Sequence, residues 1–424
     1  MTGTVTFIRF LIEFTENGGV TKPALIRHNK ADVLIDRDLS GNPHIPGASL
    51  AGALRERARN TIADKSAVDA LFGNVDPVTN KATASTLWIM NATPEGDEKP
   101  EVMWATAIDR TTGAARNHML RGAEQLQAGA TFVCRLWAFD EPTLLATLKA
   151  ILDGWQPQLG RGTSTGHGTA EIRDLTWGQL DLNQPSELER WLTDQGPELV
   201  DAVATTTAPL TPFEPRRDSE LHLNFTVKGP IALGGEKGKP VIVHGSSIKG
   251  VIRSRIEYIL RSADHPVAPC LDQRCGVCDP CRWFGHAGGR SHDPTRPASL
   301  QSAVRFQDAS VDGAKGRPRT RVALDRFTGG AAIQTRTDAA IHPSKKRGGM
   351  LVTDWVIEVG TFTTKLTIKP GFDAAERARL VGLLRQVAQD FNDRLIGVGA
   401  HTTRGYGDVD LTIVEPTAAT GDPE

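Results

Sequence analysis

The feature that most constrains the fold of this chain is a sequence motif that occurs twice. The stretch "HIPGASLAGALRERAR" at 44–59 is matched by "VIVHGSSIKGVIRSRI" at 241–256. Three further motifs recur in the same order: "ALFG" as "RWFG", "AIDRTTGAA" as "ALDRFTGGA", and a late G-x5-G-x-G loop that ends at Gly168 and again at Gly407. Four motifs repeated in order indicate a tandem duplication, so we expect two domains of the same fold.

Each half also reads as the same order of secondary-structure elements. A strand comes first, then a helix after the serine turn, then strands, a second helix and a last strand. Ser49 is the expected N-cap of the first helix, and Leu50 and Leu54 fall on its apolar face. This order is typical of a ferredoxin-like (RRM-like) α+β fold, in which helices cover one face of an antiparallel sheet.

The predicted domain organisation follows from the repeat and from a change of composition between its copies. The stretch "TTTAPLTPFEPRR" is rich in Thr and Pro, as linkers are, although "SELERWLTDQGPELVDAVA" before it has the composition of a helix. The last residues, "EPTAATGDPE", are expected to be disordered. The predicted parts are a first domain at 1–176, a linker at 177–217, a second domain at 218–416 and a disordered tail at 417–424.

Composition limits where the protein works and what it binds. The formal net charge is −1, so any nucleic-acid site must be a local patch on a balanced surface. No run approaches the roughly 20 apolar residues of a membrane span, and "MTGTVTFIRF" looks like a first strand rather than a signal peptide. We therefore expect a cytoplasmic protein without a membrane partner.

Four of the five cysteines form a cluster with metal-ligand spacing. Cys270, Cys275, Cys278 and Cys281 are spaced C-x4-C-x2-C-x2-C. Four thiolates suit a tetrahedral Zn²⁺ and leave no coordination position open, so a structural zinc knuckle is predicted, with an iron–sulfur cluster as the rival. Disulfides are disfavoured in a reducing cytoplasm. Cys134 lies in an apolar run and is expected to be a small core residue.

Taken together, the repeated motifs resemble the RAMP superfamily of CRISPR-associated proteins, and in particular the backbone subunits of type III effector complexes. The family's "IPGSSLKGxLR" run, its "AIDRxTGxA" segment and its glycine-rich loop each have two counterparts here. A tandem fusion of two such subunits is similar to the III-D group. The resemblance implies two RAMP domains with inserted thumb hairpins. It also implies guide (CRISPR) RNA, target RNA and other type III effector subunits as partners in antiviral defence.

The repeated motifs also suit RNA on chemical grounds. Backbone N–H groups at a helix N-terminus attract a phosphate, and a ring beside a glycine loop can stack on a base. In the family the Asp-Arg motif begins the thumb hairpin, which wedges into the guide–target duplex, where an apolar side chain offsets lost stacking. The predicted RNA-binding residues are Ser49, Arg55, Asp109, Arg110, Met119, His167, Ser247, Lys249, Arg253, Asp325, Arg326, Ile333, Arg404 and Tyr406.

Each of these assignments competes with a purely structural interpretation. Ser49 can simply cap its helix, the glycine loops can be tight turns that end each domain, and Asp109 and Arg110 can form a salt bridge that holds the hairpin.

The resemblance also points to one cleavage site. In the catalytic subunits of the family, one Asp before the serine turn cuts target RNA with a divalent metal. Asp32 occupies the matching place, and Asp36 and Asp38 are nearby alternatives. A carboxylate there would bind Mg²⁺ or another divalent metal, or orient a 2′-hydroxyl for attack on the adjacent phosphate. The second half offers only Glu236 in a shorter loop, so a metal-dependent endoribonuclease site is predicted in the first half alone.

Two other functions fit the same sequence. A non-catalytic, RNA-binding scaffold subunit would share the motifs, with Asp32 as an ordinary loop charge. A guide-RNA processing endonuclease would share the ferredoxin-like fold and use an early histidine, for which His28 is the candidate.

Overall fold

The computed structural model divides the chain into two compact units, unit 1 at Met1–Arg216 and unit 2 at Arg217–Glu424. Both are mixed α+β units, as expected. The backbone alone is described at 23–28 and 351–352. The described residues are 3–28, 31–76, 79–109, 114–194, 196–214, 219–233, 240–263, 269–270, 275–286, 299–322, 324, 326–330, 351–369 and 372–415.

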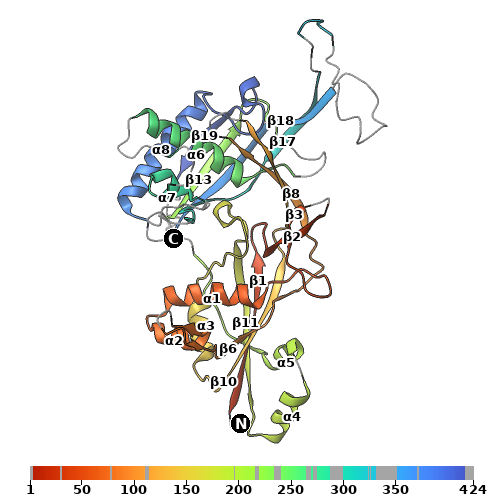
Figure 1. Ribbon diagram of the computed structural model, residues 1–424, viewed down its shortest axis with the longest axis vertical. Helices are drawn as coiled ribbons and strands as arrows, with labels where there is room; N and C mark the ends of the chain where they lie inside the picture. Colours follow the sequence, from red (N-terminus) through yellow and green to blue (C-terminus); the bar gives the residue numbers. More distant parts are fainter. Residues whose placement is uncertain are drawn as a thin grey trace, which may run out of the picture. The chain divides into compact units, whose positions relative to one another are not determined.

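The main sheet of unit 1 is antiparallel, with strand order β12-β11-β1-β10-β6 and with β7 also paired to β10 (Figure 1). Apolar side chains alternate along the central strand, so Ile8, Phe10, Ile12 and Phe14 point into one core. Its strands are β1 (Thr4–Phe14), β6 (Leu87–Ile89), β7 (Thr93–Pro94), β10 (Thr131–Phe139), β11 (Ala170–Asp181) and β12 (Thr206–Thr207).

Two helices bury their apolar stripes against that face of the sheet. α1 (Gly47–Thr61) contributes Leu50 and Leu54, and α3 (Leu144–Leu152) contributes Leu144 and Leu148. The short α2 (Lys65–Phe72) packs beside α1, and the β4 (Asn74–Val75) and β5 (Ala82–Thr83) pair follows it. Cys134 is completely buried in this core, as predicted.

The opposite face of the sheet is covered in part by α4 (Pro185–Thr193) and α5 (Gly196–Val203). Val5 and Phe7, the inward side chains of β1 on this face, pack against α5. The guanidinium of Arg135 on β10 donates two hydrogen bonds to the Asp201 carboxylate, at 2.8 and 2.7 Å. The described residues 177–194 and 196–207, part of the predicted linker at 177–217, therefore pack within unit 1, and the domain boundaries stay predictions.

A second sheet of unit 1 has the order β2-β3-β9-β8, with β3 and β9 parallel. Its strands are β2 (Thr21–His28), β3 (Ala31–Ile35), β8 (Glu101–Ile108) and β9 (Ala115–Gln125). The β8 and β9 strands form a two-stranded ribbon.

Unit 2 repeats the main sheet as β15-β18-β13-β19, again antiparallel, with β17 paired to the long β18. Leu221, Leu223 and Phe225 face a core that α6 and α8 complete. No described helix of either unit combines the length and apolar character of a membrane span. The elements are β13 (Glu220–Val227), β14 (Ile242–Val243), α6 (Gly245–Ser262), α7 (Asp279–Phe284), β15 (Val304–Phe306), β16 (Ala309–Ser310), β17 (Asp312–Val322), β18 (Leu351–Ile368), α8 (Ala374–Asn392) and β19 (Val409–Val414).

The duplication extends to single hydrogen bonds. α2 ends at Gly73 and α7 at Gly285, with φ of 76° and 74°. The Ser85 hydroxyl contacts one backbone carbonyl near the end of α2 and another in β6. The Ser302 hydroxyl makes the matching contacts with carbonyls of α7 and β15. The two units are therefore copies of one structural plan.

We predict that Asp201→Ala lowers the stability of unit 1, because it leaves the buried Arg135 guanidinium without its carboxylate. The expected loss in the free energy of unfolding is about 1–2 kcal/mol, since Asp201 is partly exposed to solvent. Asp194→Ala is the control, because its surface pair with Arg190 contributes less than about 0.5 kcal/mol. Equal denaturation midpoints for both variants would mean that the Arg135–Asp201 pair contributes no more to stability than a surface ion pair.

Candidate nucleic-acid interface and metal centre

In unit 1 the main helix begins where its backbone touches a strand. Gly47 is the first helical residue, and its N–H donates to Oδ1 of Asn91 at 2.8 Å. A Cβ on Gly47 would lie 2.5 Å from the carbonyl oxygen of Ile89, so only glycine fits. The prediction that Ser49 caps this helix is wrong: Pro46 occupies the N-cap position, and Asn91 supplies the accepting oxygen.

Unit 2 uses the same arrangement with a charged acceptor. The Gly245 N–H donates to Oδ1 of Asp308 at 2.8 Å, and the other carboxylate oxygen lies 3.1 Å from Nδ1 of His244. A Cβ on Gly245 would lie 2.2 Å from the carbonyl oxygen of Phe306. The carboxylate at this helix start is stabilised by the positive end of the helix dipole.

A groove of about 440 Å³ runs between α1 and the glycine-rich loop of unit 1. It brings the first and the last of the repeated motifs together, although more than a hundred residues separate them in the chain. Its lining residues are Val20, Thr21, Ala48, Ser49, Gly52, Ala53, Glu56, Gln158, Leu159, Gly160 and Arg161. Thr21, Gln158 and Arg161 were not predicted from the sequence, although the basic residue inside "LGRGTSTGHG" was an available signal for Arg161.

No steric contact within the described structure requires glycine at the two glycine positions inside the main helices. Gly52 and Gly250 are exposed, each the sixth residue of its helix, and a Cβ on either would meet nothing within 4 Å. Glycine inside a helix costs up to about 1 kcal/mol relative to alanine. Gly382 in α8 also has open space around it. Gly52 and Gly250 differ from Gly382 because they occupy matching positions in the two units, beside the serine turns.

Two polar atoms on the wall of the groove have no hydrogen-bond partner within the described structure. They are the hydroxyl oxygen of Thr21 and Nε2 of Gln158, and both are buried. A buried polar atom without a partner costs about 1–3 kcal/mol, so a ligand or water in the groove would recover that energy.

The glycine loops themselves are held by close backbone packing. Gly160 has φ of +94°, and a Cβ there would lie 1.8 Å from the carbonyl oxygen of Gly19. Gly399 has φ of +90° and would place a Cβ 2.6 Å from the carbonyl of Ala232. The alternative interpretation of these loops, as tight turns that end each domain, therefore explains these glycines.

The two rings predicted to stack on bases have partners inside their own units. Nδ1 of the half-buried His167 lies 3.1 Å from Nε2 of Gln125. Tyr406 is only 8% exposed, and the guanidinium carbons of Arg319 and Arg321 lie 5.7 and 5.9 Å from its ring centroid. These contacts fix both rings and leave little of Tyr406 for a base.

The two repeated arginines brace the main helices. Nη2 of Arg55 donates to Asp69 on α2 at 2.9 Å. Arg253 is 7% exposed and donates to Glu257 at 2.9 Å, to the carbonyl of Gly285 at 2.7 Å, and toward Sγ of Cys281 at 3.8 Å. RNA binding by either arginine stays a prediction, and these contacts give both a structural role.

The other predicted residues of unit 2 differ in exposure. Ser247, Arg326 and Arg404 are exposed to solvent. Lys249 is largely buried, and its Nζ donates to the Ser302 hydroxyl at 3.1 Å. Burial, together with the nearby cations of Arg253 and Lys369, lowers the pKa of Lys249 to about 7.

Asp109, the described residue of the Asp-Arg motif in unit 1, directly follows β8 in the β8–β9 ribbon. Asp109 forms an ion pair with Arg116 on the returning strand, with Nε and Oδ2 3.1 Å apart. Met119 is half-buried on β9. The predicted residues Arg110, Asp325 and Ile333, as well as Glu236 and the tail at 417–424, lie outside the described residues.

The three candidate catalytic aspartates have different surroundings. Oδ2 of Asp32 accepts the N–H of Gly122, which joins β3 to β9. Burial would raise the pKa of Asp36, but the hydrogen bond and charge of Lys22, at 2.7 Å, outweigh it and lower that pKa. The Asp38 carboxylate accepts the N–H groups of Asn42 and Ser40, and the Asn42 bond is the main cause of its lowered pKa.

The competing histidine, His28, ends β2. Its side chain is not among those described.

The four cysteines of unit 2 gather into one cluster, as predicted. All four Sγ atoms lie within 4.8 Å of one another, and Cys270 Sγ lies 3.4 Å from that of Cys281 and 3.8 Å from that of Cys278. A tetrahedron of Zn–S bonds near 2.3 Å has edges of about 3.8 Å, so the donor set fits zinc. Among the described residues no other group of three or more Cys, His, Asp or Glu side chains has a metal-binding arrangement.

Ion pairs and an aromatic contact fasten the cluster to the rest of unit 2. Asp279 pairs with Arg379 on α8, and the Arg379 guanidinium lies 5.5 Å from the ring centroid of the buried Trp283. Arg282 pairs with Glu376. The knuckle is therefore part of the unit 2 core and not an appended loop.

The chain is similar in sequence to one protein family. The model of the RAMP superfamily matches residues 3–171 and 224–410. No curated protein matches.

Among solved structures, a chain of the type III-B Cmr-beta complex in its apo state matches with 13% identity and a TM-score of 0.35. The match covers 39% of this chain and 96% of that one. A chain of the Cmr-beta complex bound to cognate target RNA matches with 13% identity and a TM-score of 0.35, covering 40% and 96%.

We predict that the purified protein holds one zinc ion per chain and that its removal destabilises unit 2. Structural zinc contributes folding energy directly, so chelation is expected to lower the unfolding temperature of unit 2 by roughly 5–10 °C and to leave unit 1 unchanged. Cys278→Ser should abolish zinc in elemental analysis, whereas Cys134→Ser should retain it. Iron with acid-labile sulfide in place of zinc would contradict the zinc assignment.

Proposed function

The chain belongs to the RAMP superfamily, and from that premise we propose that it is a backbone subunit of a type III CRISPR effector complex. In this proposal each unit binds guide RNA beside its main helix, and the complex captures complementary target RNA. Other subunits of the complex are its protein partners. The strand order β11-β1-β10-β6, with α1 and α3 on one face, supports a ferredoxin-like plan for the units.

The observation that carries the RNA proposal is the pair of exposed glycines at matching positions of α1 and α6. Neither Gly52 nor Gly250 has a neighbour that would exclude a side chain, yet each unit keeps the flexible residue beside its serine turn. A sugar–phosphate strand that approaches the helix backbone closely gives a reason for glycine that the chain alone does not.

The chemistry of the unit 1 groove supports the same ligand. Arg161 offers a cation for phosphate, the Ser49 and Thr21 hydroxyls and the Gln158 amide offer neutral hydrogen bonds, and Glu56 can accept from a 2′-hydroxyl. A groove with one cation, one carboxylate and several neutral polar groups can contact both the phosphates and the sugar hydroxyls of a single strand.

For cleavage we propose Asp32, with Asp36 and Asp38 as alternatives. Asp36 is paired with Lys22, and Asp38 caps its own turn. Asp32 also has a local partner, the Gly122 N–H, so the preference for Asp32 rests on its place in the family's motif. Mg²⁺ is commonly held by one or two carboxylates together with phosphates and water, so a single aspartate suffices as the protein ligand. When bound, such an ion would stabilise charge on the reacting phosphate. Asp32 would hold the ion or orient the 2′-hydroxyl beside it.

We predict that Gly52→Ala makes unit 1 more stable and its RNA binding weaker. The new methyl group removes the backbone cost of glycine, about 0.5–1 kcal/mol, but occupies the space that the RNA strand needs. Guide-RNA affinity should fall by roughly tenfold or more, about 1.4 kcal/mol. Gly382→Ala is the matched control, expected to gain stability without losing affinity. Unchanged guide-RNA affinity of the Gly52→Ala variant would contradict RNA binding in this groove.

We predict that Asp32→Asn abolishes target cleavage and preserves guide binding. The amide oxygen can still accept the Gly122 N–H, so only the charge is lost, and the rate should fall by roughly 10²-fold or more. The measurement is cleavage of labelled target RNA by the assembled complex with Mg²⁺. Loss only in Asp36→Asn or Asp38→Asn would relocate the site, and cleavage by all three variants would favour the scaffold function. Failure of guide maturation in His28→Ala would favour the processing endonuclease.

A further inference from the structure

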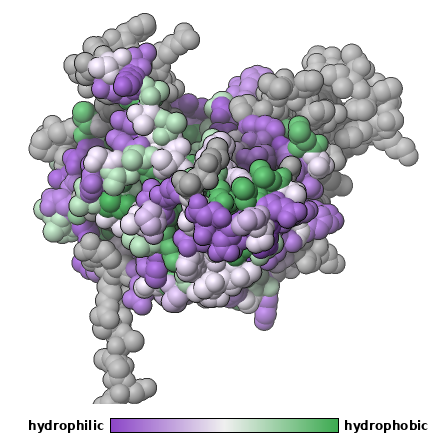
Figure 2. Space-filling model, turned by 90° about the horizontal axis from the view of Figure 1, so that it is seen from below, coloured by the Kyte–Doolittle hydropathy of each residue, from purple (hydrophilic) through white to green (hydrophobic). Residues whose placement is uncertain are grey.

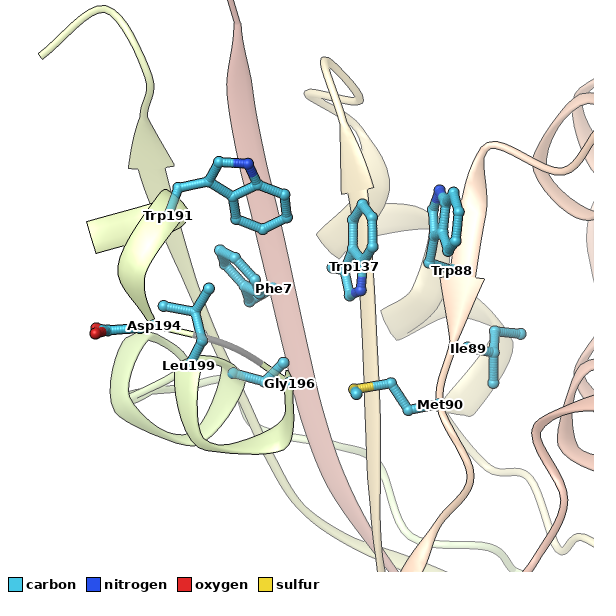
Figure 3. Close-up of a pocket in the computed structure, with 10 residues that line it drawn as sticks. Phe7, Trp88, Ile89, Met90, Trp137, Trp191, Asp194, Gly196 and Leu199 are labelled. Atoms are coloured by element: carbon cyan, nitrogen blue, oxygen red, sulfur yellow. The ribbon is translucent and has the colours of Figure 1, made fainter. Parts of the chain in front are cut away.

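An aromatic row crosses the face of the unit 1 sheet opposite α1 and α3. Phe7 on β1 is the register partner of Trp137 on β10, and Trp137 is the partner of Trp88 on β6. The rings of Trp88 and Trp137 are stacked, with centroids 4.8 Å apart and planes 7° apart. Trp191 from α4 packs edge-on against Trp137 at 5.4 Å, so three strands and a helix build one aromatic surface (Figure 3).

The helices cover only part of this row. Trp191 and α5 cover Phe7, but Trp88 is 58% exposed, and Leu192 on α4 is 66% exposed. Figure 2, which looks from the side where α4 lies in Figure 1, shows apolar surface between polar residues. Between the helices and the strands lies a pocket of about 350 Å³, which we call the tryptophan pocket. Its lining residues are Phe7, Trp88, Ile89, Met90, Trp137, Trp191, Asp194, Gly196, Leu199 and Val200.

The fold itself does not require these rings. In unit 2, Asp308 and Ser302 match Asn91 and Ser85, and the same spacing makes Arg305 the counterpart of Trp88. The corresponding row of unit 2 is Arg305, Thr367 and Glu220, which are register partners in the same way. The second copy of the plan folds with a polar row, so the shared plan does not require these rings. In unit 1, Phe7, Trp137 and Trp191 pack with α4 and α5, whereas the exposed Trp88 lies outside that cluster.

The charge around the tryptophan pocket indicates what it binds. Residues 185–203 carry five carboxylates and a single arginine, and one of the five, Asp201, is paired with Arg135 and Arg9 of the sheet. Asp194 lines the pocket itself, and its pair with Arg190, at 3.4 Å between half-exposed side chains, is weak. The remaining carboxylates leave a net negative charge on this segment, which repels the phosphates of RNA, while the face of a tryptophan ring attracts a guanidinium or ammonium group.

We propose that the tryptophan pocket is a docking site for another protein subunit, and that it takes an arginine side chain from a basic segment of that partner. The apolar stem of that arginine would lie along Met90 and Leu199, with its guanidinium toward Asp194. The residues beside it in the partner segment would pack on the exposed face of Trp88, at the other end of the pocket. Tryptophan and arginine are the residues that most often dominate protein interfaces. The site lies outside the proposed RNA groove and functions whether or not that groove binds RNA.

The test uses the full-length protein labelled with 5-fluorotryptophan, with the Trp88 signal assigned from Trp88→Phe. The probes are the peptide acetyl-Gly-Pro-Arg-Pro-Gly-amide and its twin with neutral citrulline in place of arginine. The arginine peptide should shift the fluorine signals of Trp88 and Trp137 with a dissociation constant in the order of millimolar, and added salt should weaken it. The citrulline peptide should bind at least about threefold more weakly, because the charge is absent.

Variants separate the pocket from general effects. Asp194→Asn, a surface change, should reduce affinity for the arginine peptide and abolish its preference over citrulline. Trp104→Ala is the matched control, since Trp104 is a similarly exposed tryptophan, 53%, on β8, and its loss should leave binding unchanged. Three results would overturn the proposal. The first is that the two peptides bind equally well or that neither binds. The second is a Trp88 shift caused by oligouridine instead, and the third is a shift that depends only on protein concentration, which would indicate a second copy of the chain.

Discussion

Each unit depends on the contact between the start of its main helix and the neighbouring strand. Gly47 and Gly245 come so close to strand carbonyls that any side chain would collide, and a side chain two residues beyond the strand accepts the first helical N–H. This contact fixes where the helix begins and which way its first turns point. In unit 1 it therefore sets Ser49 and Gly52 beside the glycine loop and forms the groove.

The two copies brace that helix by different means. In unit 1, Arg55 pairs with Asp69 on the following short helix. In unit 2, Arg253 points into the protein and bonds to the end of α7 and toward a thiol of the cysteine cluster. A metal at that cluster would add a further anchor for α7, beside its ion pairs with α8, and the described part of unit 1 has no matching cysteine cluster.

The copies also differ on the far face of the sheet. Unit 1 carries an aromatic row there, partly covered by α4 and α5, whereas the matching row of unit 2 is Arg305, Thr367 and Glu220. Duplication thus preserved the main-chain plan and freed one face of one copy for a new surface. The groove and the tryptophan pocket lie on different elements, so RNA and a protein partner need not compete.

The sequence by itself determined the duplication, the α+β class, the buried Cys134 and the cysteine cluster, because each depends on periodicity or on spacing along the chain. It also pointed to Ser49 and to the glycine loop of the groove. Only the tertiary structure decided that Asn91 and not Ser49 caps α1, that Arg253 and Tyr406 are buried, and that Thr21 and Gln158 line the groove. Such properties arise from contacts between residues far apart in the chain, and a side chain's burial and partners are set by what packs around it rather than by its neighbours in sequence.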